Sequence, residues 1–164
     1  MPELIISVLA AVAVHEFGHI AAMKLCGINH GGIMPRFFGL GIKADLSGVS
    51  YRQEIAVFAA GSLANIILAI CLCKFPDISF AAAAYGIFNL MPTHFLDGGE
   101  ILRLILQICG AGDGTIRRAL SVSSYTVTVG IWTLAVYLAV KGAGVAMLIT
   151  AAYMMFVTLR TPDT

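Results

Sequence analysis

The stretch LIISVLAAVAVHEFGHIAAMKLC, residues 4–26, decides the fold that we expect for this chain. It is an apolar run long enough to cross a bilayer as one helix, since a span needs about 20 residues. His15, Glu16 and His19 nevertheless lie within it. Ionisable groups at membrane depth are costly, so they mark a functional site by default. The stretch therefore predicts a membrane-embedded helix that carries chemistry.

The composition agrees with a protein that lies in a lipid bilayer. Of the 164 residues, 59% are hydrophobic and 12% are charged, whereas soluble domains have about 25% charged residues. We expect an all-α polytopic membrane protein with four to five transmembrane helices in a single domain, residues 1–164. The formal net charge of +1 excludes a strongly basic protein, so nucleic acid is not an expected partner.

Breaks in the apolar pattern divide the chain after its first span. Gly27–Tyr51 is rich in Gly and isolated charges and predicts a loop with a small β-hairpin. A second span is expected at Gln53–Phe75 and a third at Ile78–Met91. The sequence is then interrupted at residues 92–99 and resumes as Ile101–Leu106. A broken helix is tolerated at membrane depth where it faces protein or a wet cavity, so the break predicts a polar site.

Two further spans complete the expected topology, at Leu120–Val140 and Val145–Leu159. The motif-bearing core thus occupies about residues 1–110, and additional helices occupy about residues 119–160. If the N-terminus is outside, most basic residues fall on the cytoplasmic side: Arg36, Lys43, Arg52, Arg117, Arg118 and Arg160. We therefore expect the N-terminus outside and the site in the cytoplasmic half of the membrane.

The central motif is His15-Glu16-Phe17-Gly18-His19, an H-E-x-x-H pattern on the expected helix. Histidines at positions i and i+4 share one helix face, so both can bind one Zn²⁺ while the intervening glutamate acts on a bound water. The pattern also occurs by chance in soluble helices. Inside an apolar span, however, chance does not account for three ionisable groups.

A zinc site of this kind needs a third protein ligand and an open position. We prefer Asp97, because it lies in the helix break beside Gly98 and Gly99, which allow close backbone approach. The alternative role for Asp97 is an N-cap of the helical run near Glu100, and the two roles are compatible. The other acidic candidates are Glu100, Asp45 and Glu54.

Three motifs occur in an order that resembles a known family. They are His15–His19, Gly61-Ser62-Leu63-Ala64-Asn65, and Asn89-Leu90-Met91-Pro92 leading into Leu96-Asp97-Gly98-Gly99. Together they resemble the site-2 protease family of intramembrane zinc metalloproteases, over about Val8 to Leu104. The small size and the hairpin-like loop look closest to the bacterial branch that contains the stage IV sporulation protease, which cleaves a pro-sigma factor.

The resemblance implies a role for each matching residue. His15, His19 and Asp97 would bind Zn²⁺, and Glu16 would be the catalytic general acid/base. The chain would then be an intramembrane zinc endopeptidase of regulated intramembrane proteolysis. Its partners would be a transmembrane or membrane-associated protein substrate and a regulatory membrane protein. Its location would be the bacterial cytoplasmic membrane.

Asn65 and Asn89 would line the active-site cleft, with Asn65 positioning substrate or stabilising an oxyanion. An interhelical hydrogen bond is the alternative for each amide. The chain departs from the family pattern at Ser62, where proline is usual. It also has His94, for which a solvated loop position and a role in the cleft both stay open.

A different class of function also fits a metal-binding helix. A non-hydrolytic zinc-binding membrane transporter or sensor could use the same two histidines. Metal transport does not need Glu16 between them, and transporters usually present several carboxylates along the pathway. A purely structural bundle subunit would leave the buried ionisable groups unexplained. The sequence therefore favours hydrolysis over both alternatives.

Overall fold

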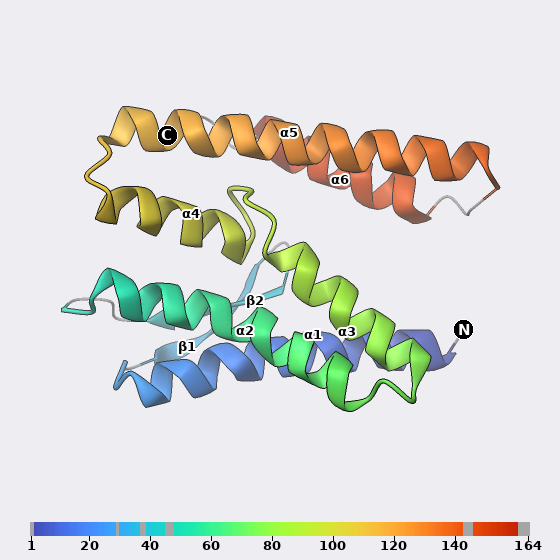
Figure 1. The fold of residues 1–164 in the computed structure, drawn as a ribbon, viewed down its shortest axis with the longest axis horizontal. Helices are drawn as coiled ribbons and strands as arrows, with labels where there is room; N and C mark the ends of the chain where they lie inside the picture. Colours follow the sequence, from blue (N-terminus) through green and yellow to red (C-terminus); the bar gives the residue numbers. More distant parts are fainter. Residues whose placement is uncertain (1, 29, 37–38, 45–47, 143–145, 161–164) are drawn as a thin grey trace.

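The computed structural model describes residues 2–28, 30–36, 39–44, 48–142 and 146–160. Within these residues the helices and strands follow one another along the chain as α1 (Pro2–Leu25), β1 (His30–Arg36), β2 (Gly39–Ala44), α2 (Tyr51–Cys71), α3 (Pro76–Asn89), α4 (Asp97–Ile108), α5 (Asp113–Val140) and α6 (Ala146–Arg160). Figure 1 shows α4 between the group formed by α1, α2 and α3 and the pair formed by α5 and α6.

Three of the described helices, α1, α2 and α5, are long and apolar enough to cross a membrane, and Met147–Leu159 in α6 is a shorter apolar helix. Apolar side chains cover their outer faces, as at Ile6, Ile70 and Val129, which are 65%, 68% and 62% exposed. Large exposed apolar surfaces of this kind require lipid or protein around them. The chain is an integral membrane protein, and a total of four to five spans stays a prediction.

Helices α1, α2 and α3 contact one another through small residues. Ala11, Ala69 and Ala82 form a buried cluster among them. A Cβ atom at Gly18 would lie 2.6 Å from the carbonyl oxygen of Ala60, so only glycine fits where α1 meets α2. Small residues allow helix backbones to approach closely in membranes. This tight contact fixes the orientation of α1 relative to α2.

The second span, predicted at Gln53–Phe75, corresponds to α2, whose two ends both lie earlier in the sequence. Helix α2 begins at Tyr51 because Ser50 and Gln53 form a capping box, in which the Gln53 side chain accepts from the Ser50 backbone N–H at 3.0 Å. It ends at Cys71 rather than Phe75. Pro76 then occupies the first turn of α3, where a missing N–H is harmless.

The break in the third apolar stretch, predicted at residues 92–99, lies at residues 90–96, because Asp97, Gly98 and Gly99 already belong to the first turn of α4. Helix α4 is amphipathic: Leu104 is fully buried, whereas Glu100, Arg103 and Gln107 carry a hydrogen-bonded polar face. It contacts α2 on one side and α5 on the other. The break thus connects the two groups of helices.

Helix α5 begins at Asp113, well before the predicted Leu120. Its first turns are amphipathic, with Ile116 and Leu120 buried, so an expectation based on continuous apolar residues misses them. Helix α6 packs along α5. Thr128 and Thr158 join the two helices through hydroxyl groups 3.1 Å apart.

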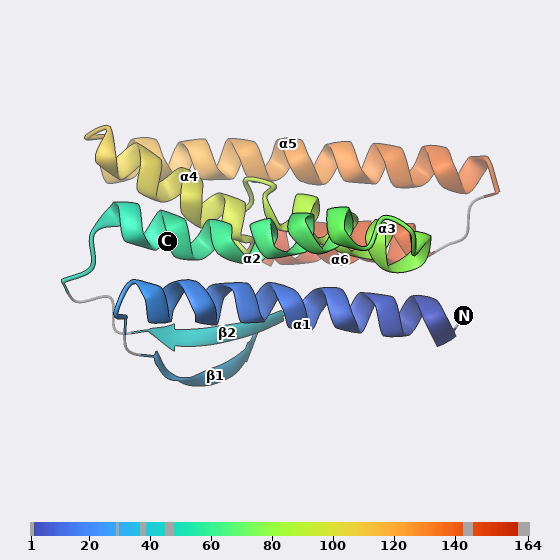
Figure 2. The same cartoon turned by 60° about the horizontal axis from the view of Figure 1, so that its bottom comes forward.

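Strands β1 and β2 pair in antiparallel register within the loop for which a small hairpin was expected, with Ile33 opposite Ile42. They lie beside α1 (Figure 2). The side chains of both strands lie outside the described residues, as does Asp45, one of the alternative ligands.

Candidate metal centre

His15 and His19 lie one turn apart on α1 and face the same way. Their side chains are almost enclosed, with 3% and 9% of each residue exposed. The rings meet edge to face with centroids 4.6 Å apart. The two Nε2 atoms are 3.1 Å apart. The i and i+4 spacing therefore brings two potential metal ligands together, as the sequence predicted.

The orientation of His19 is fixed by α2. Its Nδ1 lies 2.7 Å from the backbone oxygen of Val57. A carbonyl oxygen only accepts, so Nδ1 carries the proton and donates, which leaves the lone pair of a neutral ring on Nε2. A hydrogen bond of this kind orients a metal-binding histidine and sets its tautomer.

Gly61 allows α2 to approach both rings. A Cβ atom at this position would lie 2.5 Å from Nε2 of His19 and 2.8 Å from Cε1 of His15. On its other side, His15 meets the ring of Tyr85 edge to face, with centroids 5.2 Å apart. The histidines thus lie in a close-fitting space between α2 and α3.

Asp97 reaches the histidines from α4. Its Oδ2 is 3.0 Å from Nε2 of His15 and 3.2 Å from Nε2 of His19. The N-cap interpretation of Asp97 is wrong: Leu96 is the N-cap of α4, it makes no side-chain capping bond, and Asp97 is the first helical residue. The Asp97 side chain instead extends toward α1.

The chemistry of these three atoms fits a bound cation. Two Nε2 atoms and one carboxylate oxygen form a nearly equilateral triangle with sides of 3.0 to 3.2 Å. Tetrahedral zinc with bonds of about 2.0 to 2.1 Å would place its ligands about 3.3 Å apart. Only small outward shifts would be needed. Three hydrogen-bond acceptors that face one another repel unless a proton or a metal ion lies between them. His19 cannot supply that proton as a neutral ring, because its proton is on Nδ1.

Glu16 lies on α1 between the two histidines and is 9% exposed. Among the described residues, one group of potential ligand side chains converges closely enough to hold a metal ion: His15, His19 and Asp97. Glu54 is buried at the start of α2, outside this group. Glu100 instead accepts a hydrogen bond from Nε of Arg103 at 2.7 Å. Neither alternative acid is placed as a ligand.

The two asparagines differ in their environment. Nδ2 of Asn89 donates to the backbone oxygen of Tyr85 at 2.9 Å, within its own helix, and the interhelical hydrogen bond considered for Asn89 stays a prediction. Asn65 is fully buried. Neither polar atom of its side chain has a hydrogen-bond partner among the described residues, and the same holds for the Ser62 hydroxyl. Helix α2 continues regularly through Ser62.

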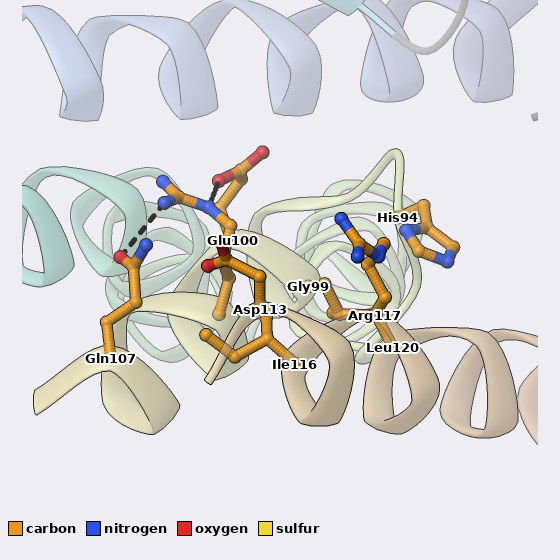
Figure 3. Close-up of a pocket in the computed structure, with 9 residues that line it drawn as sticks. His94, Gly99, Glu100, Gln107, Asp113, Ile116, Arg117 and Leu120 are labelled. Carbon is orange, nitrogen blue, oxygen red and sulfur yellow. Dashed lines mark hydrogen bonds and ion pairs between the residues drawn. The ribbon is translucent and has the colours of Figure 1, made fainter. Parts of the chain in front are cut away.

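A polar pocket of about 260 Å³ lies between α4 and α5, next to the helix break (Figure 3). Charged side chains line it from both helices, including Glu100, Arg103 and Arg117. His94 also lines it and is half-buried, so this histidine is not a fully solvated loop residue. The break therefore borders a polar space, as the sequence predicted.

Together the fold and the site define a class: a polytopic membrane protein whose apolar helices hold a candidate centre of two histidines and one aspartate. The structure resembles a site-2 protease from Methanocaldococcus jannaschii, with a TM-score of 0.71 and 20% identity, over 96% of this chain and 76% of that chain. The chain has the fold of that protein. No family model matches the sequence.

The sequence is also similar to a curated zinc metalloprotease of Methanocaldococcus jannaschii, with 31% identity over 63% of this chain. The similarity covers 34% of that relative, so the chain spans about a third of its length. The two comparisons thus agree with the resemblance drawn from the three motifs.

Sequence reasoning missed several contacts around the three candidate ligands and the loop that precedes Asp97. The Val57 carbonyl, the Tyr85 ring and the Ser124 hydroxyl, which accepts from the backbone N–H of His94, carry no motif. Two of these contacts involve backbone atoms, which every residue has. A polar residue such as Ser124 within an apolar span was the one available signal.

Proposed function

We propose that this chain is an intramembrane zinc metalloprotease of the site-2 protease family, with His15, His19 and Asp97 as zinc ligands. The observation that carries the proposal is the convergence of three ligand atoms, 3.0 to 3.2 Å apart, two from the apolar helix α1 and one from the first residue of α4. The shared fold and the similarity to a zinc metalloprotease support it.

Zinc in this site would supply a Lewis acid that polarises the scissile carbonyl and makes a water more acidic. Glu16 then acts as the general base: it takes a proton from the attacking water as the water oxygen bonds to the carbonyl carbon. The same carboxyl group delivers that proton to the amide nitrogen as the C–N bond breaks. One water is consumed, and a new carboxyl end and a new amino end are formed.

Asn65 is the residue best suited to contact the substrate at this site. It is fully buried on α2 and has unused donor and acceptor capacity among the described residues. Its helix also carries Gly61 against the two histidines. An amide donor in a dry site stabilises a developing oxyanion strongly. Asn89, whose donor is bound to Tyr85, contributes through the shape of the cleft.

The substrate that we propose is a transmembrane or membrane-associated regulatory protein, because a buried site selects substrates that enter from the bilayer. The scissile segment must be extended, since a helix shields its peptide groups. The outer edge of the β1–β2 sheet offers backbone groups for pairing with such a segment. Substitutions in these strands that leave cleavage unchanged would count against this pairing.

Within this proposal, a pro-sigma factor is the expected substrate if the chain belongs to the sporulation branch. The bacterial cytoplasmic membrane, with the N-terminus outside and the site toward the cytoplasm, is the location that the basic residues favour. A regulatory membrane protein that occupies the cleft would complete the system.

The test measures zinc content and hydrolysis in the same purified samples. We would incubate the protein in detergent and ¹⁸O-labelled water with a panel of peptides that each contain one transmembrane segment. Each segment contains Gly-Pro, which breaks the helix and exposes its peptide groups. Mass spectrometry should find one ¹⁸O atom in the new carboxyl end. Glu16→Gln should retain about one zinc per chain and lose cleavage, because the ligands remain and the base is removed. Asp97→Ala should lose both.

The matched control is Glu3→Gln, which removes an exposed carboxylate from the same helix. It should retain zinc and cleavage. Cleavage by Glu16→Gln at the wild-type rate would contradict the assigned base. A transporter would be favoured instead if the wild type bound zinc, carried zinc into vesicles and cleaved none of the peptides.

A further inference from the structure

A buried side chain of α5 forms a hydrogen bond with the loop at residues 90–96. Ser124 is fully buried in the middle of α5. Its Oγ accepts a hydrogen bond from the backbone N–H of His94 at 3.0 Å. His94 belongs to the loop and Ser124 to α5, so this bond connects the α5–α6 pair to the segment that precedes Asp97.

The path from His94 to Asp97 is short and closely packed. The backbone N–H of Leu96 donates to the Thr93 oxygen at 3.2 Å. The same Thr93 oxygen lies so close to Gly99 that a Cβ atom there would overlap it, and Gly98 is in equally close contact with the Leu90 oxygen. The loop therefore moves with the first turn of α4. A displacement at His94 is passed on to Asp97.

The histidine ligands do not depend on this loop in the same way. His19 is held by the Val57 oxygen and by the close approach of Gly61, and His15 lies against Tyr85. All of these contacts are made within α1, α2 and α3. Loss of the bond to α5 should therefore act on Asp97 and leave the histidine pair in place.

We propose that Ser124 is a positioning residue for the third metal ligand, which makes the α5–α6 pair part of the metal centre. The proposal rests on the zinc site of the proposed function. Without the Ser124 hydroxyl, the His94 N–H loses its acceptor and the loop gains freedom. The Asp97 carboxylate is then held less firmly against the two Nε2 atoms, and zinc leaves faster.

The experiment measures the rate at which purified, zinc-loaded protein releases zinc to an excess of a chromogenic chelator. Ser124→Ala should raise this rate about tenfold, within the range of about 10 to 100-fold in metal affinity that is typical when a supporting hydrogen bond is lost. Ser124→Thr, which keeps a hydroxyl, should stay near the wild-type rate. The visible absorption of the cobalt-substituted protein should change for Ser124→Ala alone.

The matched control is Thr128→Val, one turn further along α5. Thr128 is also buried, but its hydroxyl meets Thr158 of α6 rather than the loop. It should release zinc at the wild-type rate. Thermal unfolding of the zinc-free variants shows whether each one is folded.

Wild-type release from Ser124→Ala would overturn the proposal, as would equally fast release from Ser124→Thr or from Thr128→Val. In these cases the zinc site itself would stand, because the wild type still binds the metal. A wild type that binds no zinc would instead overturn the proposed function, and this inference with it.

Discussion

His15 and His19 lie on one continuous helix that packs against two others, whereas Asp97 follows a loop and begins a separate helix. The histidine rings are positioned by helix contacts at Gly61, Val57 and Tyr85. Asp97 is positioned by loop backbone and by contact with α5. One candidate metal centre thus has two halves that are held by different kinds of structure.

Because the two halves are held differently, some changes should disable the whole site and others should affect one ligand. A defect where α1 meets α2 displaces both histidines together, because one rigid helix carries them. A defect in the loop displaces only the carboxylate and leaves a two-histidine site.

Gly61→Ala should have the largest effect, because the added Cβ would lie within 2.8 Å of ring atoms of both histidines. Zinc should fall to near zero per chain, measured by atomic absorption on protein that remains monodisperse. The control is Gly130→Ala on α5, where the added methyl group meets open space. It should bind zinc normally, and its free energy of unfolding should rise by up to about 1 kcal/mol because alanine has the higher helix propensity. A wild-type zinc content in Gly61→Ala would show that α1 and α2 can move apart to accommodate the methyl group, which would contradict this prediction.

Asp97→Asn should weaken zinc binding by more than about 100-fold, beyond the range expected for a supporting residue. The two histidines should still bind copper or zinc weakly, because their positions do not depend on α4. The matched control is Asp113→Asn, which also removes a carboxylate from the first turn of a helix. Equal loss of affinity in both variants would attribute the effect to helix electrostatics rather than to coordination. Zinc competition titration distinguishes the two.

The same distinction explains how much of the site the sequence could predict. His15 and His19 were predictable because helix periodicity converts a spacing of four into a shared face. Asp97 was found through the Gly98-Gly99 pair, whose close contacts with Leu90 and Thr93 explain why glycine is required there. The N-cap role failed, because Leu96 occupies that position and the carboxylate turns toward α1.

The fold was predictable where apolar runs are continuous and less so where helices are amphipathic. The start of α5 was missed because polar residues alternate with Ile116 and Leu120. The start of α2 was missed because the capping box of Ser50 and Gln53 decides it. Contacts made by backbone atoms, such as the Val57 oxygen with His19, cannot be inferred from side-chain identity.

Gly99→Ala should disturb the loop half alone. A Cβ atom at this position would overlap the Thr93 oxygen, and overpacking of this kind costs about 1 to 3 kcal/mol. We expect a lower thermal unfolding midpoint and faster zinc release, with the histidine pair still able to bind cobalt weakly. Gly114→Ala, with open space around it, is the control: it should release zinc at the wild-type rate, with an unfolding midpoint no lower than that of the wild type. Complete loss of weak cobalt binding in Gly99→Ala would contradict the independence of the two halves.

The smallest effect is expected at Asn65, and its sign is informative. Asn65→Leu replaces a buried amide that has no hydrogen-bond partner among the described residues with an apolar group of the same branching. Removal of an unsatisfied buried polar group should raise the free energy of unfolding by about 1 kcal/mol, while peptide cleavage falls because the substrate loses its donor.

Asn89→Leu is the matched control for Asn65→Leu, since its amide donates to the Tyr85 oxygen. Loss of that bond should lower the free energy of unfolding by about 1 kcal/mol. Denaturant titrations in detergent measure both variants. A gain in stability with a loss of cleavage at Asn65 indicates that this amide is kept for catalysis at the expense of stability. A loss of stability at both positions would mean that Asn65 serves the fold, as Asn89 does.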